Sequence, residues 1–368
     1  MFKIRYIIVM RIVLLIILIL VGLAFFVIFI NKDSVFPSLN TLKPKSETPS
    51  KNITVIAEQL DTPWSIAFLP DNSMLITERN GTVALIRKKE KSEITKLGNV
   101  KEYGEGGLMG MALDPNFSSN NFIYFYYTYS GNGNNTLNRV VRLTYKNGSL
   151  SEEKIIVDEI PGGIYHNGGR IKFGPDGLLY ITTGDATQSS LAQDRDSFAG
   201  KILRVERDGK VAIYSYGHRN PQGIAWDESG QLWETEHGPS GIWPNCCQDE
   251  INKIEEGKNY GWPESVGQSV RSGTVGPVLQ SDRNVWAPAG LAYHNGSLYF
   301  GGLKGEAFYK YNISTQQLTE YFKNEYGRLR DVVLGPDNFL YITTSNLDGR
   351  GVSKSGDDKI IKINPDML

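Results

Sequence analysis

Two polar, glycine-rich segments contain side chains suited to proton transfer and charge stabilisation. In GGIYHNGGR, residues 162–170, His166 is flanked by flexible residues, and histidine is the side chain that most readily abstracts a proton near neutral pH. In YGHRNPQG, residues 216–223, Arg219 and Asn220 precede a proline in a turn that could direct a guanidinium at an anionic or carbonyl oxygen. The alternatives are a structural histidine and a loop that caps a sheet through arginine–carbonyl hydrogen bonds.

A third segment offers oxygen atoms that could bind a metal ion. ETEHGPSG is followed, after a short insertion, by DEINKIEEGKNYGWP. Gly238 and Pro239 could expose backbone carbonyls, and Asp249 and Glu250 add carboxylates. Hard oxygen donors of this kind suit calcium, although their spacing is not that of an EF-hand. The local pattern alone is therefore a weak indication of a calcium site.

Three cations near the C-terminus form a further group: Lys304 in GGLKGEAF, and Arg328 and Arg330 in GRLRDVV. The two arginines alternate along the chain, so on a strand they would share one face and could hold two carboxylates of a ligand. A solvated surface pair is the ordinary alternative. Their place immediately before a repeated hairpin, where the other unusual segments also lie, favours a ligand.

The elements that position these segments are six copies of one pattern, two strand-like segments around a turn. Each copy alternates apolar and polar positions and breaks at residues that favour a β-turn, such as PDG, PDN or HNG. A hairpin of this kind cannot bury its apolar faces alone, whereas six packed radially can. The repeat predicts an all-β, six-bladed β-propeller rather than a tandem of irregular β-sandwiches. The copies are WSIAFLPDNSMLITE from Trp64, MGMALDPNFSSNNFIYFYY from Met109, RIKFGPDGLLYITTGD from Arg170, GIAWDESGQLWETEHG from Gly223, GLAYHNGSLYFGGLKG from Gly290 and DVVLGPDNFLYITTSN from Asp331.

The chemically distinctive residues lie where these hairpins begin or end. His166, Arg219, Gly238, Lys304 and Arg328 all belong to loops that enter or leave a repeat. In a propeller, equivalent loops converge at one end of the axis and carry function. The arrangement predicts a pocket with one base and several cations, which suits a polyanionic ligand.

Composition and charge narrow the class of function. The chain has 368 residues, with 39 Lys and Arg against 40 Asp and Glu, so its net charge of −1 gives no electrostatic reason to expect nucleic acid as a partner. Its 39 glycines and 11% aromatic residues suit short strands joined by tight turns. Cys246 and Cys247 are the two cysteines, and their adjacency excludes a disulfide framework or a CxxC zinc motif. They could form a disulfide outside the cell or remain two thiols.

The N-terminus predicts an uncleaved membrane anchor. Residues 12–30 are uncharged and about long enough to cross a ~30 Å hydrocarbon layer. Lys3, Arg5 and Arg11 keep segment 1–11 in the cytoplasm by the positive-inside rule. A cleaved signal peptide is the alternative, but its apolar region usually spans roughly 7–15 residues before a small-residue cleavage site. We expect a single-pass protein of the cell membrane, with a linker at 31–51 and an extracytoplasmic propeller domain at 52–368.

From about Ile53 to Ile363 the chain resembles the soluble glucose dehydrogenase and aldose sugar dehydrogenase family, which depends on pyrroloquinoline quinone (PQQ). The resemblance rests on eight motifs in order: PWSIAFLPD, GEGGLMGMALDP, HNGGR, GHRNPQG, EHGP, DEINKIEEGKNYGWP, GLKG and RLRDVV. It implies a six-bladed propeller that uses PQQ and calcium to oxidise aldoses at the anomeric carbon to the lactone. The electrons would pass to an external acceptor, a quinone or a cytochrome, which the anchor would hold near the membrane.

The resemblance also implies roles for individual residues. His166 would take the proton of the anomeric hydroxyl, and Arg219 and Asn220 would contact the quinone oxygens. The carbonyls of Gly238 and Pro239 would bind the calcium that also contacts PQQ. The remaining implied ligands are a cationic clamp on the PQQ carboxylates, formed by Lys304, Arg328 and Arg330, and a second, structural calcium site that includes Glu250 and Tyr260.

Three departures from the family pattern bear on the substrate. Glu105 stands beside the cofactor position where glucose-oxidising members carry glutamine, and a carboxylate next to an anionic cofactor is costly unless it is protonated or paired. Tyr165 precedes the base where some members have aspartate, so His166 must be oriented differently. The insertion at 240–248, which contains the cysteine pair, could reshape the pocket beside the predicted calcium.

Two other classes of function compete with the oxidoreductase. A calcium-dependent lactonase-type hydrolase on a propeller would need carboxylates and asparagines converging on a central metal, whereas the candidates here are chiefly cationic. A non-catalytic extracellular binding module would have lost the base or the clamp, yet His166, Arg219, Lys304, Arg328 and Arg330 are all present. The sequence therefore favours a sugar-oxidising enzyme with an anionic cofactor.

Overall fold

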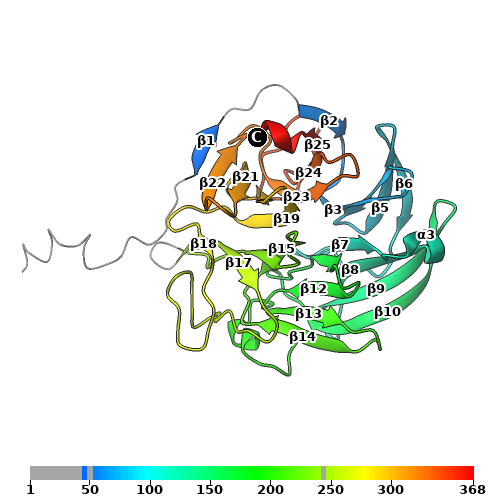
Figure 1. The fold of residues 1–368 in the computed structure, drawn as a ribbon. Helices are drawn as coiled ribbons and strands as arrows, with labels where there is room; N and C mark the ends of the chain where they lie inside the picture. The colour runs from blue at the N-terminus through cyan, green and yellow to red at the C-terminus, as the bar shows by residue number, and fades with distance from the viewer. Residues whose placement is uncertain (1–43, 48–52, 134, 242–245) are drawn as a thin grey trace, which may run out of the picture. The chain divides into compact units, whose positions relative to one another are not determined.

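The computed structural model describes residues 44–47, 53–133, 135–241 and 246–368. These residues form six β-sheets arranged around a common axis as the blades of a propeller (Figure 1). The all-β, six-bladed fold predicted from the repeat is therefore confirmed. Within the described ranges no helix has the length and apolar character to span a bilayer, and the predicted span at 12–30 lies outside them. The anchor stays a prediction.

Each blade is an antiparallel sheet in which consecutive strands pair with one another. The first blade contains β3 (Pro63–Phe68), β4 (Met74–Glu78), β5 (Thr82–Arg87) and β6 (Glu90–Lys96). The second contains β7 (Leu108–Leu113), β8 (Phe122–Ser130), β9 (Thr136–Lys146) and β10 (Ser149–Pro161). The third contains β11 (Ile171–Phe173), β12 (Leu179–Thr183), β13 (Lys201–Val205) and β14 (Val211–Tyr216).

The other three blades follow the same plan. The fourth contains β15 (Pro221–Trp226), β16 (Leu232–Glu236), β17 (Glu250–Ile254) and β18 (Leu279–Gln280). The fifth contains β19 (Pro288–His294), β20 (Ser297–Gly302), β21 (Ala307–Asn312) and β22 (Gln317–Tyr321). The sixth contains β23 (Leu329–Leu334), β24 (Leu340–Thr344), β25 (Ile360–Ile363) and, from the other end of the chain, β2 (Ile53–Ala57). Short helical turns are α3 (Phe117–Asn120) and two 3₁₀ turns, Ser189–Ala192 and Pro365–Met367.

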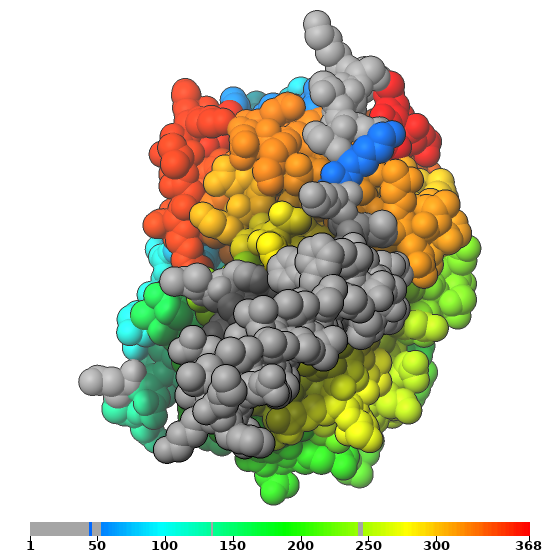
Figure 2. Space-filling model, turned by 90° about the vertical axis from the view of Figure 1, so that its left-hand side faces the viewer, coloured from blue at the N-terminus to red at the C-terminus, as the bar shows by residue number. Residues whose placement is uncertain are grey.

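The sixth blade closes the ring. β2 pairs antiparallel with β25, with Ile53 opposite Ile363 and Val55 opposite Ile361. Because this sheet joins the two ends of the propeller sequence, the ring cannot open without losing strand hydrogen bonds. A further strand, β1 (Lys45–Glu47), adds in parallel to β22, and Figure 2 shows it in blue against the orange surface of the fifth blade.

The six predicted hairpins are the two innermost strands of each blade, for example β3 with β4 and β11 with β12. Their turns share one local device. An aspartate in the turn accepts a hydrogen bond from the backbone N–H two residues further on, which stabilises the reversal of the chain. Five of the six turns contain such an aspartate: Asp71, Asp114, Asp176, Asp227 and Asp337, with donor–acceptor distances of 3.0, 2.9, 3.0, 2.9 and 3.3 Å.

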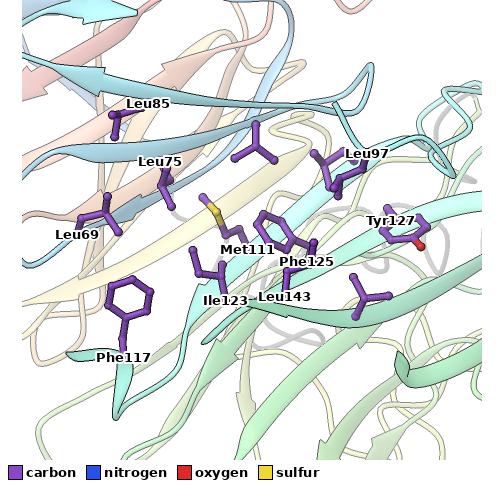
Figure 3. Packing of buried hydrophobic residues seen from close by; sticks show 13 residues of the cluster. Leu69, Leu75, Leu85, Leu97, Met111, Phe117, Ile123, Phe125, Tyr127 and Leu143 are labelled. Carbon is purple, nitrogen blue, oxygen red and sulfur yellow. The ribbon is translucent and has the colours of Figure 1, made fainter. Parts of the chain in front are cut away.

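The hydrophobic core lies between neighbouring blades. Leu75 and Leu85 of the first blade pack against Met111, Ile123 and Phe125 of the second (Figure 3). Each such side chain contributes about 1.5–3 kcal/mol on full burial, so the interfaces between blades hold the ring together. β4, β12, β16 and β24 are buried along their whole length because both faces of these inner strands meet a neighbouring blade.

The antiparallel hairpins place the predicted site residues at one end of the axis. In a hairpin, the start of the first strand lies beside the end of the second. The segments before β11, β15 and β23 contain His166, Arg219 and Arg328, and those after β16 and β20 contain Gly238 and Lys304. All five therefore lie on the same end of the propeller.

Candidate active site

A cavity of about 840 Å³ opens among these loops, a size typical of small-molecule sites. Both polar and apolar side chains form its wall. The predicted site residues that line it are Glu105, His166, Arg219, Gly238, Pro239, Lys304 and Arg328. The predicted residues that do not line it are Asn220, Arg330, Glu250 and Tyr260.

His166, the predicted base, is held by a carboxylate from its own blade. Its Nδ1 lies 2.7 Å from Oδ1 of Asp185, which follows β12, and its side chain is 17% exposed. With Nδ1–H donating to the carboxylate, Nε2 is left with a free lone pair. Asp185 is itself fixed, because Oδ1 also accepts from the backbone N–H of Thr187 and Oδ2 accepts from Nε1 of Trp262, both at 2.8 Å.

The backbone at His166 is constrained as tightly as its side chain. It has a φ of 59°, in the left-handed region that costs a non-glycine residue about 1 kcal/mol or more. Its N–H donates to Oε2 of Glu105 at 3.2 Å, and its carbonyl accepts from the N–H of Ala186 at 3.1 Å. A Cβ at Gly184 would collide with that carbonyl, so only glycine lets the HNGGR loop lie this close to the end of β12. Two elements of the sequence thus hold the base in place.

Arg219 is aimed by a carboxylate at the end of β16. Oε1 of Glu236 accepts the backbone N–H groups of Arg219 and Asn220, and Oε2 bonds Nδ1 of His218 at 2.9 Å. The guanidinium then reaches the cavity, donating to the carbonyl of His237 at 3.2 Å and to Oγ of Ser240 at 3.3 Å. Burial lowers the pKa of Arg219 from its usual value, although the surrounding carboxylates oppose this effect. It forms no ion pair among the described residues.

Asn220 joins two functional loops rather than lining the cavity. It is fully buried, and its Oδ1 accepts the backbone N–H of Gly168 at 3.0 Å. This bond connects the GHRNPQG turn to the HNGGR loop, so the positions of His166 and Arg219 depend on each other. Its predicted contact with the cofactor stays a prediction.

The Gly238–Pro239 segment is fixed from below by Asp249. Oδ1 of this buried carboxylate accepts the N–H of Gly238 at 2.8 Å, and Oδ2 accepts those of Trp286 and Ala287 at 2.7 and 2.8 Å. Burial raises the pKa of Asp249, although these three N–H groups oppose that effect. The segment is therefore a rigid part of the wall, with its carbonyl groups beside the cavity.

The three cations predicted to form a clamp, Lys304, Arg328 and Arg330, have different environments in the structure. Lys304 is exposed in the cavity and has neither a hydrogen bond nor an ion pair within the described residues. Arg328 pairs with Asp348 at 2.8 Å and donates to the carbonyl of Leu303 at 3.1 Å.

Arg330 is as buried as Arg328, each being 6% exposed, but it does not line the cavity. Its Nη1 donates to Oε1 of Gln222 at 3.0 Å, and its guanidinium lies 5.6 Å from the ring centre of Trp64. Burial lowers its pKa to about 10, so it is still protonated at neutral pH. A register shift between Leu329 and Val332 interrupts the regular alternation of β23 that was assumed for Arg328 and Arg330.

Glu105 is paired, which resolves the cost expected of a carboxylate at this position. It forms an ion pair with Arg350, and the guanidinium of Arg350 also lies 5.0 Å from the ring centre of Tyr165. Burial raises the pKa of Glu105, but the charge and hydrogen bond of Arg350, together with His237 and the N–H of His166, outweigh this effect and hold the pKa below its usual value. The pair forms one rim of the cavity, directly beside His166.

Glu250 and Tyr260 line a separate, small cavity of about 10 Å³ behind the Gly238–Pro239 segment. Oε1 of Glu250 accepts the N–H of Gly267 at 2.9 Å, while burial and the neighbouring Glu236 raise its pKa. The hydroxyl of Tyr260 donates to the carbonyl of Lys253 at 2.6 Å, and its ring stacks on His218. The structural calcium predicted for these two residues stays a prediction.

The sequence reasoning missed Asp185, His237 and Arg350. Asp185 and His237 each directly follow the second strand of a hairpin, and that end of the hairpin faces the site. This shared position in the repeat is the signal that could have identified them. His237 lines the cavity, its Nε2 is buried without a partner, and burial lowers its pKa to about 3. It is therefore a neutral ring. No local motif points to Arg350, which lies 245 residues from its partner Glu105.

Comparison with known proteins agrees with this geometry. Residues 60–354 match the family described as glucose / sorbosone dehydrogenase. Aldose sugar dehydrogenase YliI of Escherichia coli is 32% identical over 81% of this chain and 91% of its own length. Quinoprotein glucose dehydrogenase B of Acinetobacter calcoaceticus is 32% identical over 63% of this chain and 56% of its own length. The PQQ-bound aldose sugar dehydrogenase of Streptomyces coelicolor superposes with a TM-score of 0.78 at 36% identity, covering 86% of this chain and 99% of that one. The chain therefore belongs to the glucose / sorbosone dehydrogenase family of oxidoreductases.

Proposed function

We propose that this protein oxidises aldose sugars at the anomeric carbon to the corresponding lactones, using PQQ and calcium and passing the electrons to an external acceptor. The observation that carries the proposal is the charge of the cavity. Lys304 and Arg219 both face it without an ion-pair partner among the described residues. Cations held in a partly desolvated cavity are costly unless an anion joins them, so the site suits a polycarboxylate ligand.

The donors that are present fit PQQ, a planar tricarboxylate quinone. Lys304 and Arg328 can bind its carboxylates from the side of the fifth and sixth blades. Asn220 Nδ2 lies 3.5 Å from Nδ1 of the neutral His237, which leaves Nε2 as the ring donor, buried, unpartnered and lining the cavity. A buried donor without a partner costs about 1–3 kcal/mol, so a bound acceptor at that place would be stabilising.

The Gly238–Pro239 segment fits calcium, which prefers oxygen ligands. No hydrogen bond to the carbonyl oxygen of Gly238 occurs in the described part of the chain, and the carbonyl of Pro239 retains one lone pair after accepting a single N–H. Asp249 holds the segment through the N–H of Gly238, a supporting contact of the kind that orients metal ligands.

The protein's own residues then supply the acid–base chemistry. When bound, PQQ provides the two-electron acceptor, and calcium acts as a Lewis acid upon it. Nε2 of His166 takes the proton of the anomeric hydroxyl, and the carboxylate of Asp185 stabilises the imidazolium that forms. Arg219 places a fixed positive charge in the same cavity as His166, which would stabilise negative charge that develops during the oxidation.

A dye-linked assay tests this proposal. The full-length chain, purified in mild detergent, is mixed with calcium, PQQ and an electron-accepting dye across a panel of aldoses. We expect dye reduction that requires both PQQ and calcium, and loss of at least about 100-fold in turnover in His166→Ala with PQQ binding retained. A wild-type protein that binds no PQQ in the presence of calcium would overturn the proposal.

We also propose that the propeller lies outside the cytoplasm, held at the cell membrane by residues 12–30. The apolar run and its basic flank support this location. The disulfide between Cys246 and Cys247 also suits an oxidising compartment. Protease added to intact cells should degrade the propeller while sparing a cytoplasmic marker, whereas protection until lysis would contradict the topology.

A further inference from the structure

A disulfide between two adjacent residues, Cys246 and Cys247, forms part of the cavity wall. The two residues are 7% and 6% exposed, so the pair is buried and yet borders the site. Nothing in the proposed acid–base chemistry or in the PQQ contacts assigns it a role. Its neighbours indicate one.

The disulfide lies directly against the two predicted calcium ligands. The backbone N–H of Cys247 donates to the carbonyl of Pro239 at 2.8 Å. A Cβ at Gly238 would collide with the carbonyl oxygen of Cys247, so these two backbones are in close contact. Two residues further on, Asp249 accepts the N–H of Gly238. The segments 238–239 and 247–249 are thus joined by two hydrogen bonds, one from each segment to the other.

The backbone beside the disulfide has an unfavourable conformation. Cys247 and Gln248 have φ values of 75° and 55°, and two successive non-glycine residues in the left-handed region cost about 1–2 kcal/mol each. A disulfide between neighbours closes a small ring through their shared peptide, which restricts the backbone of both residues. When that ring opens, nothing covalent keeps Cys247 from returning to ordinary φ values, and its N–H would then turn away from Pro239.

We propose that the Cys246–Cys247 disulfide is a positioning element that holds the Gly238 and Pro239 carbonyls in the orientation in which they bind calcium. This inference rests on the proposed function. Reduction breaks the S–S bond and leaves two thiols: an external dithiol supplies two electrons and two protons and becomes a disulfide, whereas a phosphine supplies the two electrons and becomes its oxide, with the oxygen and both protons taken from water. Loss of a contact that orients a metal ligand typically lowers metal affinity about 10–100-fold. The protein without this disulfide should therefore need about 10-fold more calcium to bind PQQ.

The test compares the full-length oxidised protein with the double variant Cys246→Ser, Cys247→Ser. Calcium is titrated at fixed PQQ, and PQQ binding is followed by quenching of tryptophan fluorescence, a readout independent of turnover. The double variant removes both thiols, so no sulfur nucleophile can react with the quinone. Val285→Ser is the matched control, because Val285 lines the same cavity, is 40% exposed and touches neither carbonyl through a hydrogen bond.

We expect the calcium midpoint of the double variant to rise about 10-fold while that of Val285→Ser is unchanged and the unfolding midpoints of all three proteins agree. A calcium midpoint within twofold of wild type would overturn the inference. If the double variant does not fold, wild-type protein reduced by a phosphine and freed of the reagent before PQQ is added serves in its place, with the same two outcomes.

A second measurement needs neither PQQ nor calcium. Amide hydrogen exchange at position 247 reports its bond to the Pro239 carbonyl, and exchange should be faster in the double variant. Unchanged protection there would overturn the inference even if the proposed function holds. A wild-type protein that shows strong protection at this amide but binds no PQQ would instead overturn the proposed function alone.

Discussion

The variant Asp185→Asn should disturb the orientation of His166, the proposed base, while leaving the histidine in place. The carboxylate of Asp185 has three donors around it: His166 Nδ1 and Thr187 N at Oδ1, and Trp262 Nε1 at Oδ2. An asparagine has only one acceptor oxygen. If its NH₂ group replaces Oδ1, it faces the N–H of Thr187 and forces His166 into the tautomer in which Nε2 carries the proton. If it replaces Oδ2, it faces Nε1–H of Trp262.

The size of the effect follows from these contacts. A hydrogen bond to a charged partner contributes about 1.5–3 kcal/mol, and 1.36 kcal/mol corresponds to tenfold in rate, so the loss of kcat should be about 10- to 150-fold. It cannot exceed the loss caused by His166→Ala, because both changes act through the same base. One unsatisfied buried donor should also cost about 1–3 kcal/mol of stability, which a domain of ordinary stability tolerates.

The assay is dye-linked turnover at saturating PQQ, calcium and aldose, with PQQ affinity measured in parallel. Trp262→Phe supplies a rescue. In the double variant Asp185→Asn, Trp262→Phe, the NH₂ group can replace Oδ2 without facing a donor, so Oδ1 again accepts from His166. We expect the double variant to recover about tenfold in kcat over Asp185→Asn. Turnover of Asp185→Asn within threefold of wild type, with no further change in the double variant, would refute the assigned role of Asp185.

Three further predictions concern the cations and the metal. Lys304→Ala should weaken PQQ binding about 10- to 100-fold without changing the unfolding midpoint, because Lys304 has no partner in the described structure. Arg328→Ala should weaken PQQ binding and also destabilise the fold by about 3 kcal/mol, because it removes the ion-pair partner of Asp348, whose side chain is 3% exposed. Equal stability of the two variants would contradict this contrast. A calcium chelator should release PQQ and abolish turnover, and added calcium should restore both. If PQQ stays bound in excess chelator, the proposal that calcium helps to bind PQQ is wrong. Burial lowers the pKa of Lys172 from 10.5 to about 8, so between pH 8 and 10.5 the unfolded chain binds more protons than the folded one. The free energy of unfolding should therefore rise with pH in that range, by roughly 1–2 kcal/mol relative to Lys172→Met. Identical pH profiles of stability for the two proteins would refute the pKa shift.

Much of the fold could be read from the repeat because the information is local. Each hairpin contains its own alternating strands and turn, and in five of the six the turn contains an aspartate, as Asp71 and Asp176 illustrate. The site loops could be recognised by the same route, since His166, Arg219 and Lys304 stand at hairpin ends and antiparallel pairing places those ends together. What the hairpin pattern did not reveal is which side chain meets which across the blades.

The side-chain contacts that organise the site could therefore be identified only from the tertiary structure. Glu105 meets Arg350 because the ring closes at β2 and β25, and Asn220 bonds the N–H of Gly168 because the third and fourth blades lie side by side. Arg330 contacts Gln222 and Trp64 and does not line the cavity, although the alternation of Arg328 and Arg330 in sequence predicted that both would hold a ligand. The sequence by itself determined the propeller and the cationic residues of the pocket and predicted the base, because strand period, turn chemistry and residue type are local properties. Tertiary structure decided the orientation of His166 by Asp185, the pairing of Glu105 with Arg350 and the disulfide's contact with Pro239, because each depends on distances between groups that only the folded chain sets.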